Sequence, residues 1–247
     1  MFGTIWHTFF FDPVYNSLVF FIDVVPGGDV GLAIILTTIL VKVILLPLSL
    51  KVAHTQFVTQ QITPKLEEIK IKFKDKREEQ ARAMMDIYKE AGINPFSSIL
   101  LLFIQIPIVI ALYLSISRGG GITLPEINTD LLYSFIPAPS TASMMFLGFV
   151  DIAAKSIVLA AFAGISQFIH TSLAMPKPKP RENKGTPDFK EDLMHSMQFQ
   201  MRYIMPIIIF FVAYFFSAAI ALYFTVSNIA AIAQEYYVRH KGLRHTN

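Results

Sequence analysis

Long blocks of hydrophobic residues, separated by shorter polar stretches, dominate this chain. A helix needs roughly 20 largely apolar residues to cross about 30 Å of hydrocarbon. Four blocks approach or exceed that length: Val30–Leu50, with one charged residue, and Phe96–Ser117, Ser156–Leu173 and Tyr203–Gln234, with none. The last block has 32 residues and would form a helix of about 48 Å. We therefore predict that it divides near residues 216–219, which gives an all-α polytopic membrane protein with five transmembrane helices.

The segments outside these blocks predict further helices and loops. Residues 13–25 are apolar but too short to span, which favours a helix lying in the membrane interface. Residues 52–90 carry apolar side chains at spacings of three and four, so we predict a hairpin of two antiparallel helices with a turn at 74–76. Residues 176–187 are rich in Pro and Lys and predict a mobile loop.

The composition agrees with a membrane protein and excludes several chemistries. Of 247 residues, 53% are hydrophobic and 16% are charged, against about 25% charged in soluble domains; the mean hydropathy is +0.51. The absence of cysteine excludes disulfides, thiolate catalysis and cysteine-ligated metals. No phosphate-binding loop, dinucleotide motif, HExxH metal motif or nucleophile elbow is present. We therefore expect no enzyme, no cofactor and no metal site.

The distribution of basic residues predicts the topology. Of 21 Lys and Arg, 18 lie in residues 51–95, 174–202 and 239–247. Such residues collect on the cytoplasmic side of membranes, and five spans place all three segments on one face. The predicted N-terminus is external and the C-terminus cytoplasmic. Topology explains these basic segments, so we expect no specific nucleic-acid partner. No transit peptide is visible, which favours a bacterial plasma (inner) membrane over an organelle.

The full segmentation follows from these patterns. The predicted segments are residues 1–29, external with the interfacial helix; 30–50, the first span; 51–95, the cytoplasmic helical hairpin; 96–117, the second span; 118–155, an external loop; 156–173, the third span; 174–202, a cytoplasmic loop; 203–216, the fourth span; 217–238, the fifth span; and 239–247, the cytoplasmic tail.

One ionisable residue, Lys42, lies deep inside a predicted span. Lysine at mid-helix costs about 2.5–3.5 kcal/mol on insertion scales. One interpretation is that its stem reaches the headgroups. The other, which we favour, is that it faces a hydrated cavity, because none of the four blocks contains an Asp or Glu to pair with it. Water or a visiting anionic ligand would then be its counterpart.

Milder polar residues accompany Lys42 in four of the spans. Thr38 and Ser49 lie at i−4 and i+7 from Lys42 and extend one polar stripe along a single helix face. The other candidate groove residues are Gln105, Gln167 and Asn228, one in each of three further spans. Gln and Asn in hydrocarbon also hold helices together, so a structural role remains the alternative for Gln105 and Asn228.

Several motifs resemble the YidC/Oxa/Alb family of membrane protein insertases, from about Asp12 to Tyr237. The segments TPKLEEIKIKFKDK, DIYKEAGINP and LLLFIQIPIVIALY, within residues 63–113, are similar to the family's hairpin and second span. FLGFVDIA (Phe146–Ala153) resembles its FLG.DL segment, and ALYFTVSN (Ala221–Asn228) resembles the LYY.VSN of its last span. The chain departs from the family at 97–99, where Ser-Ser-Ile replaces Gly-Gly-Cys, and at 217–219, where Ser-Ala-Ala replaces Pro-Ser-Gly.

The resemblance implies a fold and an activity. The fold is five transmembrane helices around a hydrophilic groove open to cytosol and lipid, with an interfacial helix before them. The activity is insertion of nascent membrane proteins into the lipid bilayer, alone or with the Sec translocon and the ribosome, without cofactors. Lys42 takes the place of the family's groove arginine and Gln105 that of its groove glutamine. A small secondary transporter or channel, or a scaffold that assembles membrane complexes without inserting them, are the alternatives.

Overall fold

Helices make up almost all of the fold in the computed structural model, which describes residues 2–74, 76–94, 96–117, 121–175 and 199–244. The predicted loop 176–187 and the centre of the predicted turn at 74–76 lie outside the described residues. The elements in chain order are α1 (Phe2–Trp6), η1 (His7–Phe11), α2 (Asp12–Val24), η2 (Pro26–Gly28), α3 (Val30–Ile44), α4 (Leu46–Lys72), α5 (Arg77–Glu90), α6 (Ser97–Ser117), η3 (Thr129–Leu131), β1 (Met145–Phe146), β2 (Val150–Asp151), α7 (Ile157–Ala174), η4 (Gln200–Ile204), α9 (Met205–Phe216) and α10 (Ala218–Arg244).

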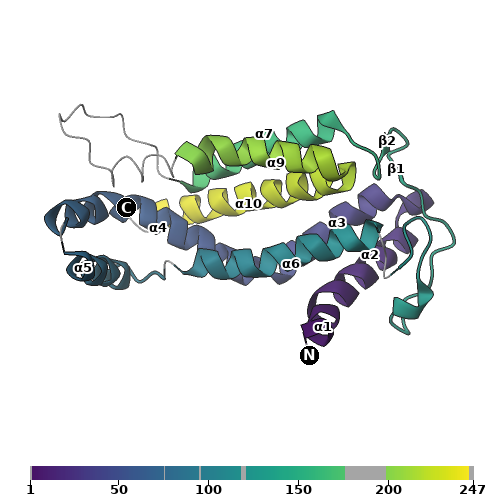
Figure 1. Ribbon diagram of the computed structural model, residues 1–247, viewed down its shortest axis with the longest axis horizontal. Helices are drawn as coiled ribbons and strands as arrows, with labels where there is room; N and C mark the ends of the chain where they lie inside the picture. Colours follow the sequence, from purple (N-terminus) through teal and green to yellow (C-terminus); the bar gives the residue numbers. More distant parts are fainter. Residues whose placement is uncertain (1, 75, 95, 118–120, 176–198, 245–247) are drawn as a thin grey trace.

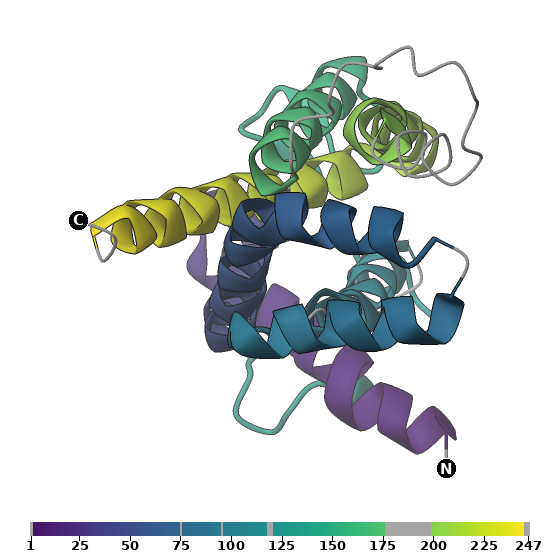
Figure 2. The same ribbon diagram turned by 90° about the vertical axis from the view of Figure 1, so that its left-hand side faces the viewer.

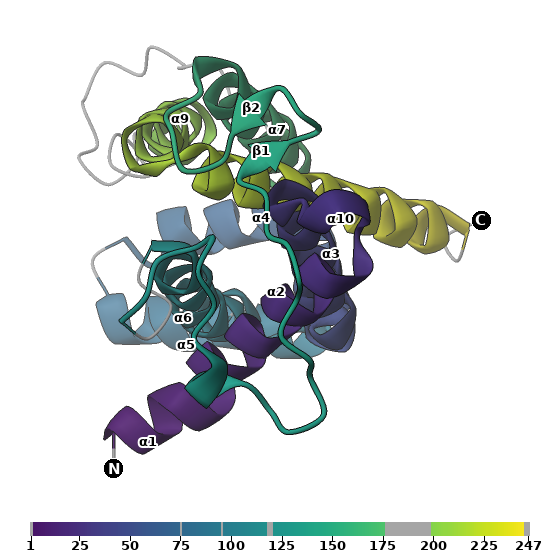
Figure 3. The same ribbon diagram turned by 90° about the vertical axis from the view of Figure 1, so that its right-hand side faces the viewer.

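The helices form an elongated bundle with different structures at its two ends (Figure 1). Helices α7, α9 and α10 run side by side along the bundle, and α3, α6 and α2 lie beneath them in this view. The α4–α5 hairpin projects from one end, where the C-terminus also lies, as the view from that side shows (Figure 2). The short β1–β2 ribbon lies at the other end, next to α7 and α9 (Figure 3).

The first apolar block is bent rather than straight. Helices α3 and α4 meet at Leu45 with an angle of 70° between them. Pro47 lies in the first turn of α4, where its missing N–H and fixed φ are compatible with a new helix but not with the interior of an old one. The bend therefore comes five residues before the predicted end of the first span at Leu50, and α4 continues without a break into the first arm of the hairpin.

The last apolar block is divided at Ser217. Its backbone is extended, with φ −171° and ψ 163°, so α9 ends at Phe216 and α10 begins at Ala218. The N–H of Ala218 donates to the carbonyl of Ala154 at 2.8 Å, and that of Ala219 to the carbonyl of Ile152 at 3.1 Å. The segment after β2 thus satisfies the amides that the helix break exposes.

Two helices, Ile157–Ala174 and Ala218–Lys241, are by themselves long and apolar enough to cross a bilayer. The bent pair α3 and α4 together would make a third. Residues 103–117 of α6 and residues 200–216, which include α9, are apolar but shorter. The fold is therefore a polytopic helical one with two to three candidate membrane spans by length and composition.

Two kinds of contact hold the bundle together. The larger cluster joins α2, α3, α6 and α10 through bulky side chains such as Leu18, Ile34, Leu112 and Tyr223. The smaller cluster joins α7, α9 and α10, and its fully buried residues are alanines, namely Ala160, Ala163, Ala213 and Ala221. Small residues let helices approach closely where the hydrophobic effect offers no driving force, as in lipid.

The N-terminal helix packs against the bundle. One side of α2 is buried, including Val14, Leu18 and Ile22, which contact α3 and α6. Asn16 is also buried; its side chain donates to the carbonyls of Asp12 and Leu131 and accepts from the N–H of Tyr133. The sequence predicted a helix here, and the structure adds that this helix is joined to the bundle and to the loop that follows α6.

The turn before α3 provides a matched pair of glycine substitutions. Gly27 and Gly28 both have left-handed φ angles, +70° and +64°. A Cβ at Gly28 would overlap the backbone carbonyl of Thr141, whereas one at Gly27 would meet nothing within 4 Å. We expect Gly27→Ala to cost about 1–2 kcal/mol for the left-handed backbone and Gly28→Ala to cost about 2–5 kcal/mol because overlap is added. Thermal unfolding of the two variants in detergent measures the difference; equal losses would contradict the overlap.

Candidate functional site

Lys42 and Gln105, the two central residues of the predicted groove, lie next to each other. The Lys42 Nζ donates to the Gln105 Oε1 at 3.5 Å, although the residues are 63 positions apart in the sequence. Lys42 comes from the last turn of α3 and Gln105 from α6, two residues before Pro107. Both are half-buried. The ammonium group therefore points toward a neighbouring helix.

The charge of Lys42 is not neutralised by a carboxylate among the described residues. No Asp or Glu in that part of the chain lies within 4 Å of its Nζ. The Gln105 Nε2 is buried without a hydrogen-bond partner among the described residues. The site thus combines a cation with an unused amide donor, and both favour an anionic or carbonyl ligand.

Thr38 and Ser49 do not form one straight stripe with Lys42. The predicted stripe assumed a single helix over residues 30–50, but the bend at Leu45 places Ser49 on α4, whose axis differs by 70°. Both hydroxyls are buried and donate to backbone carbonyls of their own turns, Thr38 to Ile34 at 2.7 Å and Ser49 to Leu46 at 3.1 Å. Such bonds are the ordinary local choice of Ser and Thr in helices.

Asn228 lies at a contact between α10 and α7. Its Nδ2 donates to the Ser166 Oγ at 3.2 Å and to the Ala163 carbonyl at 3.4 Å. This geometry is that of a polar side chain joining two membrane helices, which was the alternative interpretation for Asn228. Gln167, the next residue after Ser166, is half-buried. The described residues therefore gather around two separate centres, Lys42 with Gln105 and Asn228 with Ser166.

An open pocket of about 380 Å³ lies between α7 and α9, and none of the four residues of the two centres lines it. Its lining is almost entirely apolar and includes Gly164, Phe168, Pro206 and Phe210. Gly164 allows the two helices to approach, because a Cβ there would lie 3.1 Å from the Cβ of Phe210.

Comparison with known proteins matches most of the chain to one family. The model of the family described as 60Kd inner membrane protein matches residues 21–245. The chain belongs to this family, that of the YidC/Oxa insertases. It is 30% identical over 239 residues to Membrane protein insertase YidC 2 of Bacillus anthracis, covering 95% of this chain and 81% of the relative. It is 31% identical over 235 residues to Membrane protein insertase YidC of Oceanobacillus iheyensis, covering 93% and 82%. The YidC of Clostridium tetani is 28% identical, covering 90% and 86%.

Membership fixes the functional class. The resemblance to the YidC/Oxa/Alb insertases that the motifs predicted is confirmed. The chain is a membrane protein of the insertase family and not an enzyme.

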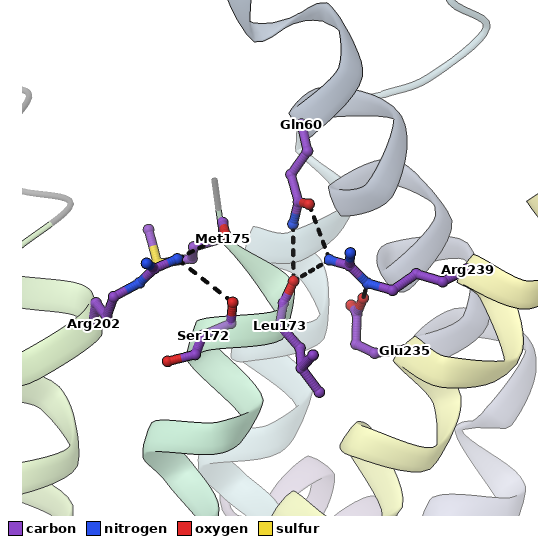
Figure 4. Close-up of polar contacts among 7 residues, drawn as sticks. All are labelled: Gln60, Ser172, Leu173, Met175, Arg202, Glu235 and Arg239. Atoms are coloured by element: carbon purple, nitrogen blue, oxygen red, sulfur yellow. Dashed lines mark hydrogen bonds and ion pairs between the residues drawn. The ribbon is translucent and has the colours of Figure 1, made fainter. Parts of the chain in front are cut away.

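Sequence reasoning missed a third polar cluster in this YidC-family chain, at the hairpin end of the bundle (Figure 4). Arg239 of α10 donates to the Gln60 Oε1 of α4 at 2.9 Å and to the carbonyl of Leu173 in the last turn of α7. The Gln60 Nε2 donates to the same carbonyl at 3.0 Å. Glu235 lies 3.5 Å from the Arg239 Nε. The cluster therefore joins three helices at one point.

The physical basis of this cluster is the end of α7. The last carbonyls of a helix have no partner within it, and basic side chains there also interact favourably with the helix dipole. Arg239 and Gln60 satisfy the carbonyl of Leu173, while the Arg202 Nη2 donates to the carbonyls of Met175 at 3.0 Å and Ser172 at 3.5 Å (Figure 4). The signal available in the sequence was the i,i+4 spacing of Glu235 and Arg239. The predicted fifth span ended at residue 238, between these two residues. In the structure, α10 continues through both of them to Arg244.

Proposed function

We propose that this chain is a membrane protein insertase that moves polar segments of nascent membrane proteins part-way across the bilayer. The path is a hydrophilic groove open to the cytosol, with Lys42 and Gln105 at its centre. The observation that carries the proposal is the pairing of these two side chains between α3 and α6, in a chain that matches an insertase family along nearly its whole length. The proposed groove residues are Lys42, Gln105, Thr38, Ser49, Gln167 and Asn228.

The proposed topology has five spans. In residue ranges they are 30–50, 96–117, 156–173, 203–216 and 217–238, with residues 51–95 and the C-terminus cytoplasmic and the N-terminus external in a plasma membrane. The arrangement of the helix ends supports this topology, because the α4–α5 hairpin and the C-terminus share one end of the bundle while β1 and β2 occupy the other (Figure 1). The positive-inside rule then orients the hairpin end toward the cytosol.

The mechanism follows from the cost of moving polar groups through hydrocarbon. A hydrated groove reaching part-way into the bilayer shortens the dry distance that the client tail must cross. Lys42 attracts acidic residues of that tail; one such pair at 4 Å is worth roughly 4 kcal/mol at an effective dielectric of about 20, before desolvation. Lysine offers a point charge rather than the planar fork of arginine, which suits transient binding. The apolar helix of the client then leaves sideways into lipid, driven by burial of its own surface.

The hairpin α4–α5 is the proposed first contact for the client. Its outer surface carries mixed charges and includes the exposed ion pairs Lys76–Glu79 and Lys89–Asp86. The Sec translocon and the ribosome are further proposed partners, reached from the same cytoplasmic end.

Reconstitution of the purified protein tests the function directly. Vesicles containing only this protein should insert a single-spanning client with a short acidic external tail, measured as protection of that tail from added protease. Matched vesicles without the protein give the background. Insertion no greater than this background would show that the protein does not insert clients alone.

The same vesicles distinguish an insertase from the two alternative functions, a non-inserting scaffold and a small transporter or channel. A non-inserting scaffold would leave the client tail accessible to protease while still binding the client. A transporter or channel would move small solutes, and a flux assay with an entrapped dye and ions detects that movement. The proposal expects protected tails without solute flux.

A further inference from the structure

We propose that the turn between β1 and β2 is a lipid anchor, in which Leu147 and Phe149 insert into the interfacial layer of the bilayer at this end of the bundle. This site is separate from the proposed groove, and its function as an anchor does not depend on client insertion. The ligand is the phospholipid surface itself.

The first observation is the exposure of the turn. Phe149 is 85% exposed, the highest value among the large hydrophobic side chains described, and Leu147 is 56% exposed. Met145, at the start of β1, is exposed as well. Single apolar residues on a surface are ordinary, but a group of them on one projecting turn marks an interaction site.

The second observation is that the turn is held rigidly in this exposed position. The buried Asp29 accepts from the N–H of Leu32 at 3.0 Å with one oxygen and from the N–H of Leu147 at 2.7 Å with the other. One carboxylate thus caps α3 and fixes the turn. The N–H of Phe149 also donates to the carbonyl of Phe146 at 3.0 Å, which closes the turn on itself.

Leu147 adds local strain to this arrangement. Its φ is +51°, a left-handed conformation that is unfavourable for a side chain with a Cβ. Strained residues persist where the surroundings over-determine them, and an observed outlier of this kind suggests a function. Here the strain presents an apolar side chain outward, which a glycine at this position would not do.

The third observation places the turn at the level where the apolar helices end. The segment after β2 is hydrogen-bonded to the corner between α9 and α10, through Ala218 to Ala154 and Ala219 to Ile152. The ribbon itself lies beside the start of α3 and next to α7 and α9 (Figure 3). In the proposed five-span topology, these helix ends lie at the boundary of the hydrocarbon layer.

Lys155 indicates that lipid headgroups surround the turn between β1 and β2. Its Nζ lies 5.4 Å from the ring centroid of Phe215 and 5.8 Å from that of Tyr214, at the end of α9. A basic side chain with aromatic rings is typical of the headgroup layer, where Lys, Tyr and Trp collect. Ile157 at the start of α7 and Phe215 near the end of α9 are also exposed apolar side chains. The turn therefore shares this end of the bundle with exposed apolar helix ends and with a basic–aromatic group, and lipid is the occupant we infer.

Tryptophan fluorescence tests the anchor in the full-length protein. Trp6 is the single tryptophan, so Trp6→Phe with Phe149→Trp gives one reporter on the turn. The protein is reconstituted in phosphatidylcholine and phosphatidylglycerol vesicles with bromines placed near the headgroup or near the chain end. We expect blue-shifted emission that the shallow bromines quench most strongly, for a depth of about 5–10 Å. Circular dichroism confirms that the variant is folded.

Two further single-tryptophan variants calibrate the reporter. Phe215→Trp, on the exposed end of α9, should be quenched, whereas Ile71→Trp, 69% exposed near the end of α4, should emit as in water. Water-like emission from residue 149 would overturn the proposal. Blue-shifted emission that bromines do not quench would also overturn it, and would indicate a protein cover; if that shift depended on the protein-to-lipid ratio, the cover would be a second copy of the chain.

Discussion

Lys42→Ala is expected to slow the insertion of clients with acidic tails about tenfold, which corresponds to a loss of about 1.4 kcal/mol of stabilisation. The expected loss is smaller than the direct attraction because desolvation of both charges opposes it. Clients that differ only in having a neutral tail should insert almost as before. The measurement is the initial rate of tail protection in vesicles containing the variant.

Three companion variants make the charge dependence specific. Lys42→Arg keeps the charge and should keep the rate with acidic clients, while Lys42→Glu should reduce it further than alanine by repulsion. Lys241→Ala removes an exposed positive charge from the last turns of α10, outside the groove and the hairpin, and should leave the rate unchanged, which controls for net charge. Normal insertion of acidic clients by both Lys42→Ala and Lys42→Glu would refute the electrostatic mechanism.

The sequence predicted several local features of the fold because those features depend on the length of one apolar block or on the residue spacing within one segment. The length of the last apolar block required a break near 216–219, and α9 ends at Phe216. The three- and four-residue spacing of apolar positions predicted helices in 52–90, where α4 and α5 lie. The bend at Leu45 was harder to place. A proline is compatible with a kink inside a helix or with the first turn of a new helix, and only the packing around Pro47 decides between them.

The contacts between helices could not be predicted from the sequence. Four spans each offered a polar side, but the order of helices around the bundle decides which polar residues meet. Asn228 meets Ser166 of α7, not Lys42, because α10 packs closely along α7 through alanines. The bond from Arg239 to Gln60 joins residues 179 positions apart. No periodicity within either segment indicates such a contact, so the cluster at the end of α7 emerges only from the three-dimensional arrangement.

Arg239→Ala is expected to destabilise the protein by about 3–5 kcal/mol, because breaking a buried ion pair leaves an uncompensated charge. Glu235 is 1% exposed and Arg239 is 27% exposed. The substitution also leaves the carbonyl of Leu173 with Gln60 as its remaining side-chain donor, and removes the guanidinium from the Phe57 ring, 5.8 Å away. Thermal unfolding in detergent should show a Tm lower by roughly 6–20 °C.

A double variant that removes both charges tests whether the loss of stability comes from the unpaired carboxylate of Glu235. Glu235→Gln with Arg239→Ala removes both charges and should recover a large part of the Tm, since the penalty of the unpaired carboxylate disappears. Lys76→Ala breaks the exposed pair with Glu79, whose side chains are 65% and 52% exposed, and should cost less than about 1 kcal/mol. If Arg239→Ala lowered the Tm no more than Lys76→Ala, or if the double variant were no more stable than Arg239→Ala alone, Glu235 and Arg239 would not act as a buried pair. A loss that the double variant recovers would show that the unpaired Glu235 carboxylate, rather than the missing Arg239 bonds to Gln60 and Leu173, causes the destabilisation.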